Sequence, residues 1–129
     1  MDMPLTLRFA NIGGVLMLAV GLLGLFRPDL LARLLSISAV GRLGLAEIRG
    51  SLGGLFVALA LTVLIAQERN IFAVAGIAWL GAAAGRSISW WRDGTREARN
   101  AIAIAAELLL GYLLLAPVIA VWWRVLFGA

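Results

Sequence analysis

Residues 45–66 read LAEIRGSLGGLFVALALTVLIA, and this stretch decides the fold. It is long enough to cross a bilayer, because about 20 mainly apolar residues in an α-helix span the hydrocarbon core. Its only charged residues are Glu47 and Arg49, both near the beginning. The stretch therefore predicts a transmembrane helix that carries two ionisable groups close to one end.

Three further apolar stretches of similar length occupy approximately residues 5–26, 71–91 and 98–123. The hydrophobic fraction of 63% and the mean hydropathy of +1.01 exceed the values of soluble proteins, in which about half of the residues are apolar. We therefore expect an all-α fold, an integral membrane four-helix bundle, with the lipid bilayer as its surroundings. Residues 1–129 are expected to form a single transmembrane domain, because four spans leave room for short connections only.

The connection between the first two spans contains the segment PDLLARLL, residues 28–35. Proline is favoured at the first position of a helix, and the leucines lie on the opposite side from Arg33. The segment is too short to cross the membrane, so we expect a short interfacial helix in the headgroup plane. A plain connector is favoured over a lipid- or partner-binding role.

The arginines predict the orientation of the spans. Six arginines follow the first and third spans, and three lie on the opposite side. Because cytoplasmic loops carry an excess of basic residues, both termini are expected outside the cytoplasm. The paired tryptophans at residues 90–91 and 122–123 are expected to anchor span ends at the two membrane interfaces. The six arginines assigned to the cytoplasmic side are Arg27, Arg33, Arg42, Arg92, Arg96 and Arg99.

The composition excludes several kinds of chemistry. Cysteine, histidine and lysine are all absent, which removes thiol nucleophiles, disulfides, imidazole bases, Schiff-base lysines and the usual zinc and haem ligands. We therefore expect no metal and no cofactor. The net charge of +4 is attributed to interfacial arginines near anionic headgroups, and no nucleic-acid partner is expected.

Small residues recur at helical spacing in the second and third spans. Such stripes allow another helix to approach closely, because packing between helices in lipid depends on van der Waals contact. We expect the partner helix to belong to the same chain, with a second copy as the alternative. The predicted packing residues are Ala46, Gly50, Gly53, Gly54, Ala58, Gly81 and Gly85.

Charged residues inside or beside the spans predict an ionic cluster in the cytoplasmic half. Its members are Glu47, Arg49, Arg86, Asp93 and Glu107. Glu47 is expected on the close-packed glycine face, pointing into protein, whereas Arg49 lies about 200° around the same helix and needs another partner or a route to the interface. Glu107 could meet Arg86 or Arg49, and Glu47 could take the other.

Three roles are open for this cluster. It could stabilise the bundle and fix its register, or it could bind a polar headgroup or anion through the guanidinium groups. A proton relay through Glu107 is the weakest of the three, because a carboxylate beside two arginines should stay charged.

Four motifs occur in order along the chain. They are the E-x-R-x-x-x-G-G pattern that begins at Glu47, the pair Gly85-Arg86, the pair Asp93-Gly94, and Glu107. In these motifs the chain resembles a bacterial family of small four-span membrane proteins known as domain of unknown function 4345. The resemblance covers nearly the whole chain. It implies that the same charged residues occur together, and it implies no activity.

The leading hypothesis is a non-catalytic accessory or scaffold protein of a bacterial inner membrane that packs against a larger membrane protein complex or forms a homo-oligomer. The alternative is a small transporter or a protein that binds lipid headgroups or anions through the Glu/Arg cluster. An enzyme is the third choice, because hydrolysis by carboxylates needs a water-filled site of which the sequence gives no sign.

Overall fold

A computed structural model of the chain describes residues 4–128, and this part of the chain is almost entirely helical. Four helices are long and apolar enough to span a membrane. The sequence-based prediction of an all-α, multi-pass membrane protein is thus confirmed. The four helices are α1 (Leu5–Phe26), the continuous helix Gly41–Ala66, α5 (Arg69–Arg92) and α6 (Ala98–Phe127).

The first span has the predicted bounds, whereas the other three helices extend beyond theirs. The second helix begins at Gly41 rather than near residue 45, and the last helix ends at Phe127 rather than near residue 123. The extensions contain Arg42 and Arg124. Long basic side chains at span ends reach the headgroups while their backbone stays helical, so an apolar boundary does not mark the end of a helix.

The described chain divides into two compact units. The first, here called the α5–α6 unit, contains residues 4–13 and 67–128, and the second, the α1–α4 unit, is Gly14–Ala66. The α1–α4 unit includes α2 (Pro28–Leu35), α3 (Gly41–Ile48) and α4 (Leu55–Ala66). Each unit is described separately below.

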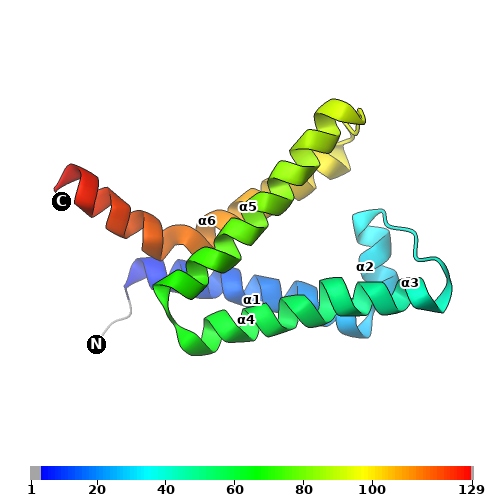
Figure 1. Cartoon of the computed structure of the whole chain (residues 1–129), viewed down its shortest axis with the longest axis horizontal. Coiled ribbons are helices and arrows are strands. Elements are labelled where there is room, and N and C mark those ends of the chain that lie inside the picture. The colour runs from blue at the N-terminus through cyan, green and yellow to red at the C-terminus, as the bar shows by residue number, and fades with distance from the viewer. Residues whose placement is uncertain (1–3, 129) are drawn as a thin grey trace. The chain divides into compact units, whose positions relative to one another are not determined.

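In the α5–α6 unit, the two long helices run side by side in opposite directions (Figure 1). A methyl group added at Gly76 would lie 3.1 Å from the carbonyl oxygen of Gly111, and one added at Gly111 would lie 3.1 Å from that of Gly76. Real Cβ atoms rarely approach other atoms so closely. These two glycines therefore mark the point of closest approach between α5 and α6, as small residues do in membrane helix pairs.

In the α1–α4 unit, α1 and α4 also lie side by side (Figure 1). A Cβ at Gly21 would lie 2.7 Å from the backbone nitrogen of Val57, and one at Gly24 would lie 2.8 Å from that of Gly53. A Cβ at Gly53 would in turn lie 2.7 Å from the backbone nitrogen of Leu25. The two helices therefore meet backbone against backbone, and only glycine fits at these positions.

A π-helical segment, Arg49–Gly54, joins α3 to α4 within the second span. Its hydrogen bonds connect each residue to the fifth along the chain, so it accommodates one residue more than an α-helical turn. Three of its six residues are glycines, which have low helix propensity. The extra residue shifts all following side chains around the helix relative to a regular helix, by about 100°.

The short helix α2 forms at the predicted position. Pro28, Leu31 and Ala32 are buried, and Leu31 and Ala32 form a small core with Ile48. On the exposed side Arg33 contacts Asp29 at 3.3 Å, one turn apart. The helix therefore packs on its own unit through its apolar side.

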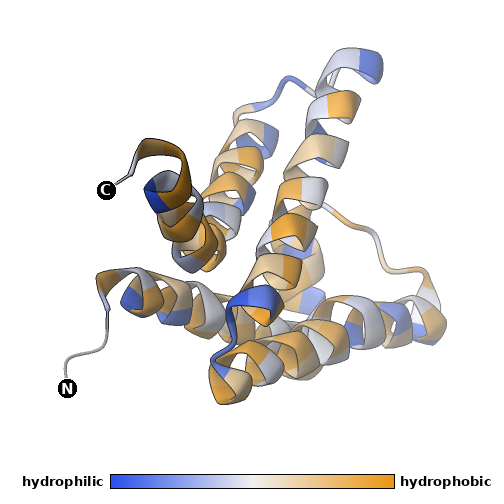
Figure 2. Cartoon of the chain, turned by 60° about the vertical axis from the view of Figure 1, so that its left-hand side comes forward, coloured by the Kyte–Doolittle hydropathy of each residue, from blue (hydrophilic) through white to orange (hydrophobic). Residues whose placement is uncertain are grey.

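The hydropathy of the surface agrees with a lipid environment. Apolar residues cover the lengths of the long helices, and hydrophilic residues gather toward helix ends and connections (Figure 2). Val74 on α5 is 64% exposed, and Leu109 on α6 is 56% exposed. Water would penalise such exposure, whereas hydrocarbon does not.

Candidate functional site

An ion pair joins the two helices of the α5–α6 unit. Arg86 on α5 donates a hydrogen bond from Nε to Oε1 of Glu107 on α6, at 2.7 Å. The Glu107 side chain is 11% exposed, and that of Arg86 is 31% exposed. The sequence left open whether Glu107 meets Arg86 or Arg49. The structure shows the pair with Arg86.

The positions of the two residues explain why they can meet. At 1.5 Å per residue, Arg86 lies about 9 Å from the end of α5, and Glu107 lies about 13 Å from the start of α6. The helices run in opposite directions from the connection between them, so these two depths are measured from the same end. The difference of about 4 Å is within the reach of an arginine side chain. Gly111, one turn from Glu107, keeps the two backbones close.

The second carboxylate oxygen of Glu107, Oε2, has no hydrogen-bond partner among the described residues, although this atom is buried. The contact with Arg86 through Nε and Oε1 is therefore not a two-pronged guanidinium–carboxylate pair, which would satisfy both oxygens. A buried acceptor without a partner costs about 1–3 kcal/mol. Oε2 is thus the polar atom of this site that could receive a donor from a ligand.

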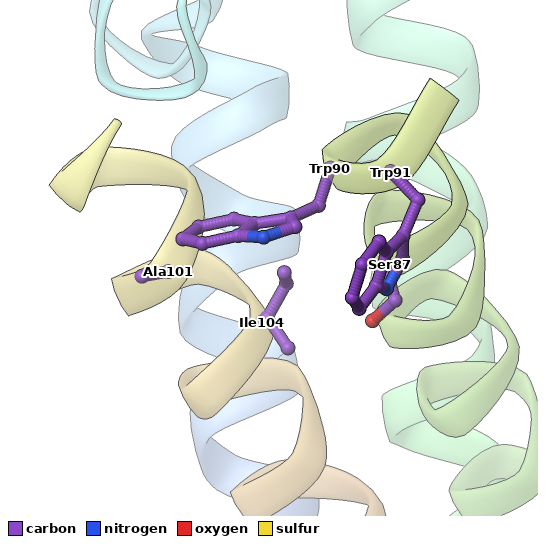
Figure 3. A pocket seen from close by; sticks show the side chains of 5 residues that line it. All are labelled: Ser87, Trp90, Trp91, Ala101 and Ile104. Carbon is purple, nitrogen blue, oxygen red and sulfur yellow. The ribbon is translucent and has the colours of Figure 1, made fainter. Parts of the chain in front are cut away.

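A pocket with a volume of about 290 Å³ lies near the same end of α5 and α6. Trp90 extends from α5 toward Ala101 of α6, Trp91 lies along α5 beside Ser87, and Ile104 points between the two helices (Figure 3). Ser87 donates its hydroxyl hydrogen to the carbonyl of Ala83, at 2.8 Å. Neither Arg86 nor Glu107 lines this pocket. Its lining is mainly apolar, and it includes Ser87, the residue that follows Arg86 in the sequence.

Arg49, in the α1–α4 unit, has a different partner. Its Nε donates to the carbonyl oxygen of Leu25, at 3.1 Å. Leu25 lies in the last turn of α1, whose carbonyl groups lack partners within the helix. Arg49 thus caps the C-terminus of α1, as basic side chains often do. This contact could not be predicted from the sequence, since a backbone carbonyl acceptor is common to all residue types.

The remaining two acidic members of the predicted cluster lie in exposed positions. Glu47 is exposed and borders a pocket with Ser38, Val40 and Ile48. The expectation that Glu47 points into the packed interior is therefore wrong. Asp93 is the exposed residue that ends α5, and its amide donates to the carbonyl of Ser89. Among the described residues, neither acid has an ion-pair partner within 4.0 Å.

The predicted stripe of small residues also needs correction. Gly53 makes a close contact, but a Cβ built at Gly50, Gly81 or Gly85 would have no described atom from beyond the surrounding helical turns within 4 Å. A Cβ at Gly54 meets only the carbonyl of Arg49 in its own helix, at 3.6 Å, and Ala46 and Ala58 are exposed. The α-helical spacing used for the prediction fails across the π-helical segment. In the described chain, close contacts with the backbone of another helix are made by Gly53 and by Gly21, Gly24, Gly76 and Gly111.

The acidic residues of the described chain are not gathered around the ion pair. Within residues 4–128 there is no group of three or more potential metal-binding His, Cys, Asp or Glu residues. Glu107 is the one buried charged residue in that range, and its neighbour in the ion pair is an arginine. A pair of carboxylates, as used for general acid and base catalysis, is therefore not assembled around Glu107.

Comparison with known proteins identifies a family but no activity. No curated protein matches the chain. No solved structure matches it either. A family model described as "Domain of unknown function (DUF4345)" matches residues 8–118, which include both members of the ion pair and all of the π-helical segment. The chain therefore belongs to the DUF4345 family.

Proposed function

We propose that this protein is a non-catalytic accessory or scaffold protein of a bacterial inner membrane, which packs against a larger membrane protein or a second copy of itself. The observation that carries this proposal is a small-residue surface on α5. Gly81, Ala84 and Gly85 are all exposed, and no other part of residues 4–128, apart from the helix itself, comes within 4 Å of a Cβ built at either glycine.

This surface has the composition of a helix interface without a neighbour in its own unit. Gly81 and Gly85 are spaced by four residues, which places them on one side of the helix, and Ala84 lies beside them. Small residues at this spacing let two helix backbones approach closely in lipid. The glycines that pack within the α5–α6 unit, Gly76 and Gly111, are different residues, so the surface is additional to the internal contact.

The test compares two identical substitutions on exposed alanines. Ala84→Leu fills the small-residue surface of α5, whereas Ala105→Leu changes an exposed alanine of α6. Each tagged variant is purified in mild detergent, and its complex is sized by native mass spectrometry. We expect Ala84→Leu to abolish a larger assembly that wild type and Ala105→Leu retain. A wild-type protein that is monomeric in detergent and in lipid nanodiscs would contradict the proposal.

A second candidate function is the binding or transport of a small polar ligand at the ion pair. The observation that favours it is the buried Oε2 of Glu107, which has no hydrogen-bond partner in the described chain. A ligand with an N–H or O–H donor would satisfy this oxygen. Glu107→Gln keeps the shape of the side chain but removes its charge, so it should abolish binding of a cationic ligand in a flux or thermal-shift assay. Full retention of binding would exclude this site.

The proposal includes an orientation with both termini outside the cytoplasm. It is supported by the excess of arginines after the first and third spans. Thr95 lies in the connection between α5 and α6, and in the proposed orientation Thr95→Cys is protected from a membrane-impermeant maleimide in intact cells. A cysteine placed at Gly128 should be labelled. The opposite labelling pattern would reverse the orientation.

A further inference from the structure

A polar pocket lies at the end of the α5–α6 unit that is remote from the ion pair. It has a volume of about 230 Å³ and is bordered by residues from the starts of α1 and α5 and from the C-terminal part of α6. Its polar border includes Arg69, Arg124, Gln67 and Thr6. Among the described residues, 4–128, neither an aspartate nor a glutamate lines it, so within this range the two guanidinium groups supply the charge of the pocket.

Neither of these two arginines is neutralised by an acidic side chain of the described residues. Arg27, Arg33 and Arg86 each have a carboxylate within 4.0 Å. For Arg69 and Arg124, no carboxylate of residues 4–128 lies within that distance. Arg124 donates from Nε to the carbonyl of Ala120, at 3.3 Å, which fixes the base of its guanidinium group and leaves the terminal amino groups for another acceptor.

Gln67 holds one wall of the pocket in place. Its side-chain amide donates to Oδ1 of Asn11 at 2.7 Å and accepts from Nδ2 of Asn11 at 3.1 Å. The backbone of Gln67 is in the left-handed region, with φ of 53°, which is uncommon for a residue other than glycine. The paired amides thus tie the connection before α5 to α1. Gln67 positions the pocket, and the two arginines supply its charge.

An apolar groove continues from this pocket. It has a volume of about 520 Å³, shares Pro4, Thr6 and Arg124 with the pocket, and extends along α6 as far as Tyr112. Aromatic residues, among them Phe9 and Trp123, form part of its walls. From Tyr112 to Arg124 the length along the helix is about 18 Å, which is close to half of the hydrocarbon thickness of about 30 Å. The groove therefore has the length of one acyl chain.

We propose that the pocket and the groove together bind one anionic phospholipid. The phosphodiester lies between Arg69 and Arg124, and one acyl chain lies along Phe9, Tyr112 and Trp123. Arginine is suited to this role because its planar donors match phosphate oxygens. Free phosphate would use the arginines but not the groove. The continuity of the two spaces through Arg124 is the reason for choosing a lipid.

The first test measures retention of phosphatidylglycerol by the purified protein, with zwitterionic phosphatidylcholine as the comparison lipid. Native mass spectrometry in mild detergent gives the bound fraction during titration with each lipid. In the double variant Arg69→Gln/Arg124→Gln we expect binding of phosphatidylglycerol to weaken by about thirtyfold, since each lost hydrogen bond to the phosphodiester weakens binding about fivefold. Arg92→Gln/Arg96→Gln, at the opposite end of α5, is the matched control and should bind as wild type.

The second test separates a lipid from free phosphate. Ala120→Phe places a ring in the groove, and Ala105→Phe is the control on an exposed part of α6. We expect Ala120→Phe alone to weaken phosphatidylglycerol binding, and we expect 10-fold excess inorganic phosphate to compete poorly. The melting temperature of each variant is measured in lipid-free detergent. Only variants that melt at the same temperature as wild type are compared, which excludes loss of fold as the cause of weaker lipid binding.

Three results would overturn the proposal. The first is an equal weakening of phosphatidylglycerol binding in the Arg69/Arg124 variant and in the Arg92/Arg96 control. The second is binding of phosphatidylcholine as tight as that of phosphatidylglycerol. The third is efficient competition by inorganic phosphate together with no effect of Ala120→Phe, which would assign the pocket to a free anion.

Discussion

The two units hold their helices together by different means, although both contain an arginine and a glutamate in a membrane-length helix. In the α5–α6 unit the charges lie on different helices and form an ion pair, one turn from the contact of Gly76 with Gly111. In the α1–α4 unit Glu47 and Arg49 lie on the same helix, and the closest contacts between the helices are made by glycines. The position of a charge, rather than its presence, therefore decides its structural role.

The reason is geometric. Two residues apart in a helix point about 200° away from each other, so Glu47 and Arg49 cannot pair directly. Arg49 instead caps the carbonyl of Leu25, and Glu47 remains exposed. Arg86 and Glu107 come from neighbouring antiparallel helices at similar depth, where pairing is direct. The comparison predicts that charge removal will affect the two units to very different extents.

The largest effect is expected from breaking the ion pair. Glu107→Gln leaves Arg86 without its countercharge, and loss of one partner of a buried pair costs about 3–5 kcal/mol. Because Arg86 is partly exposed, we expect about 3 kcal/mol. The free energy of unfolding is measured by denaturant titration in mixed micelles.

A double-mutant cycle with Arg86→Met provides the control for that prediction. The double variant removes both charges, so it should be more stable than the sum of the single changes implies, by about 2 kcal/mol. Strictly additive effects would show that the 2.7 Å contact contributes no coupling, and the contrast between the units would then disappear.

Smaller changes in stability are expected in the α1–α4 unit, where substitutions of two nearby glycines should act in opposite directions. A methyl group at Gly53 would lie 2.7 Å from a backbone nitrogen, whereas one at Gly50 meets nothing within 4 Å. Gly53→Ala should therefore destabilise by about 2 kcal/mol through overpacking. Gly50→Ala should be neutral or stabilise by up to about 1 kcal/mol through helix propensity.

Melting temperatures in the same detergent measure both glycine variants. Both glycines lie in the π-helical segment Arg49–Gly54, so each variant is the control for the other. Equal melting temperatures for the two variants would mean that the close contact at Gly53 does not hold α1 against α4.

The smallest effect is expected for the cap of α1. Arg49→Gln removes the Nε donor to the carbonyl of Leu25, and a single hydrogen bond of this kind contributes about 1 kcal/mol. Glu47→Gln changes an exposed residue without an ion-pair partner in the described chain and should leave stability unchanged. Hydrogen exchange at the last amides of α1 would detect the lost cap. A larger effect for Glu47→Gln than for Arg49→Gln would contradict the assignment.

The sequence predicts the coarse fold well because apolar length is a direct consequence of bilayer thickness. All four spans were predicted on this basis, whereas the short helix that starts at Pro28 was predicted from its proline and from leucines on the side opposite Arg33. The Arg86–Glu107 pair was among the predicted pairings, because depth within antiparallel helices can be counted from their connection. The choice between Arg86 and Arg49 required knowledge of which helices are neighbours, and residue spacing does not contain that information.

The close contacts were predicted less well, for an identifiable physical reason. Counting residues assumes a regular α-helix, but the second span contains a π-helical segment at Arg49–Gly54. The count therefore selected Gly50 and Gly54 together with Gly53, whereas of these three only Gly53 makes a close contact with another helix. The glycines of the first span, Gly14, Gly21 and Gly24, were not singled out. Their spacings of seven and three residues place them on one side of a helix, which is the signal that could have found them.

The proline inside α6 has a consequence for the membrane that the protein can occupy. The helix Ala98–Phe127 has 30 residues and a contour length of about 45 Å. Proline at position 117 lacks the amide that would bond to the preceding turn, and α6 bends in its C-terminal part (Figure 1). A bend shortens the projection of the helix on the membrane normal without tilting its N-terminal half. The α5–α6 pair can therefore keep one packing arrangement in bilayers of different thickness, with hydrophobic mismatch absorbed beyond Pro117.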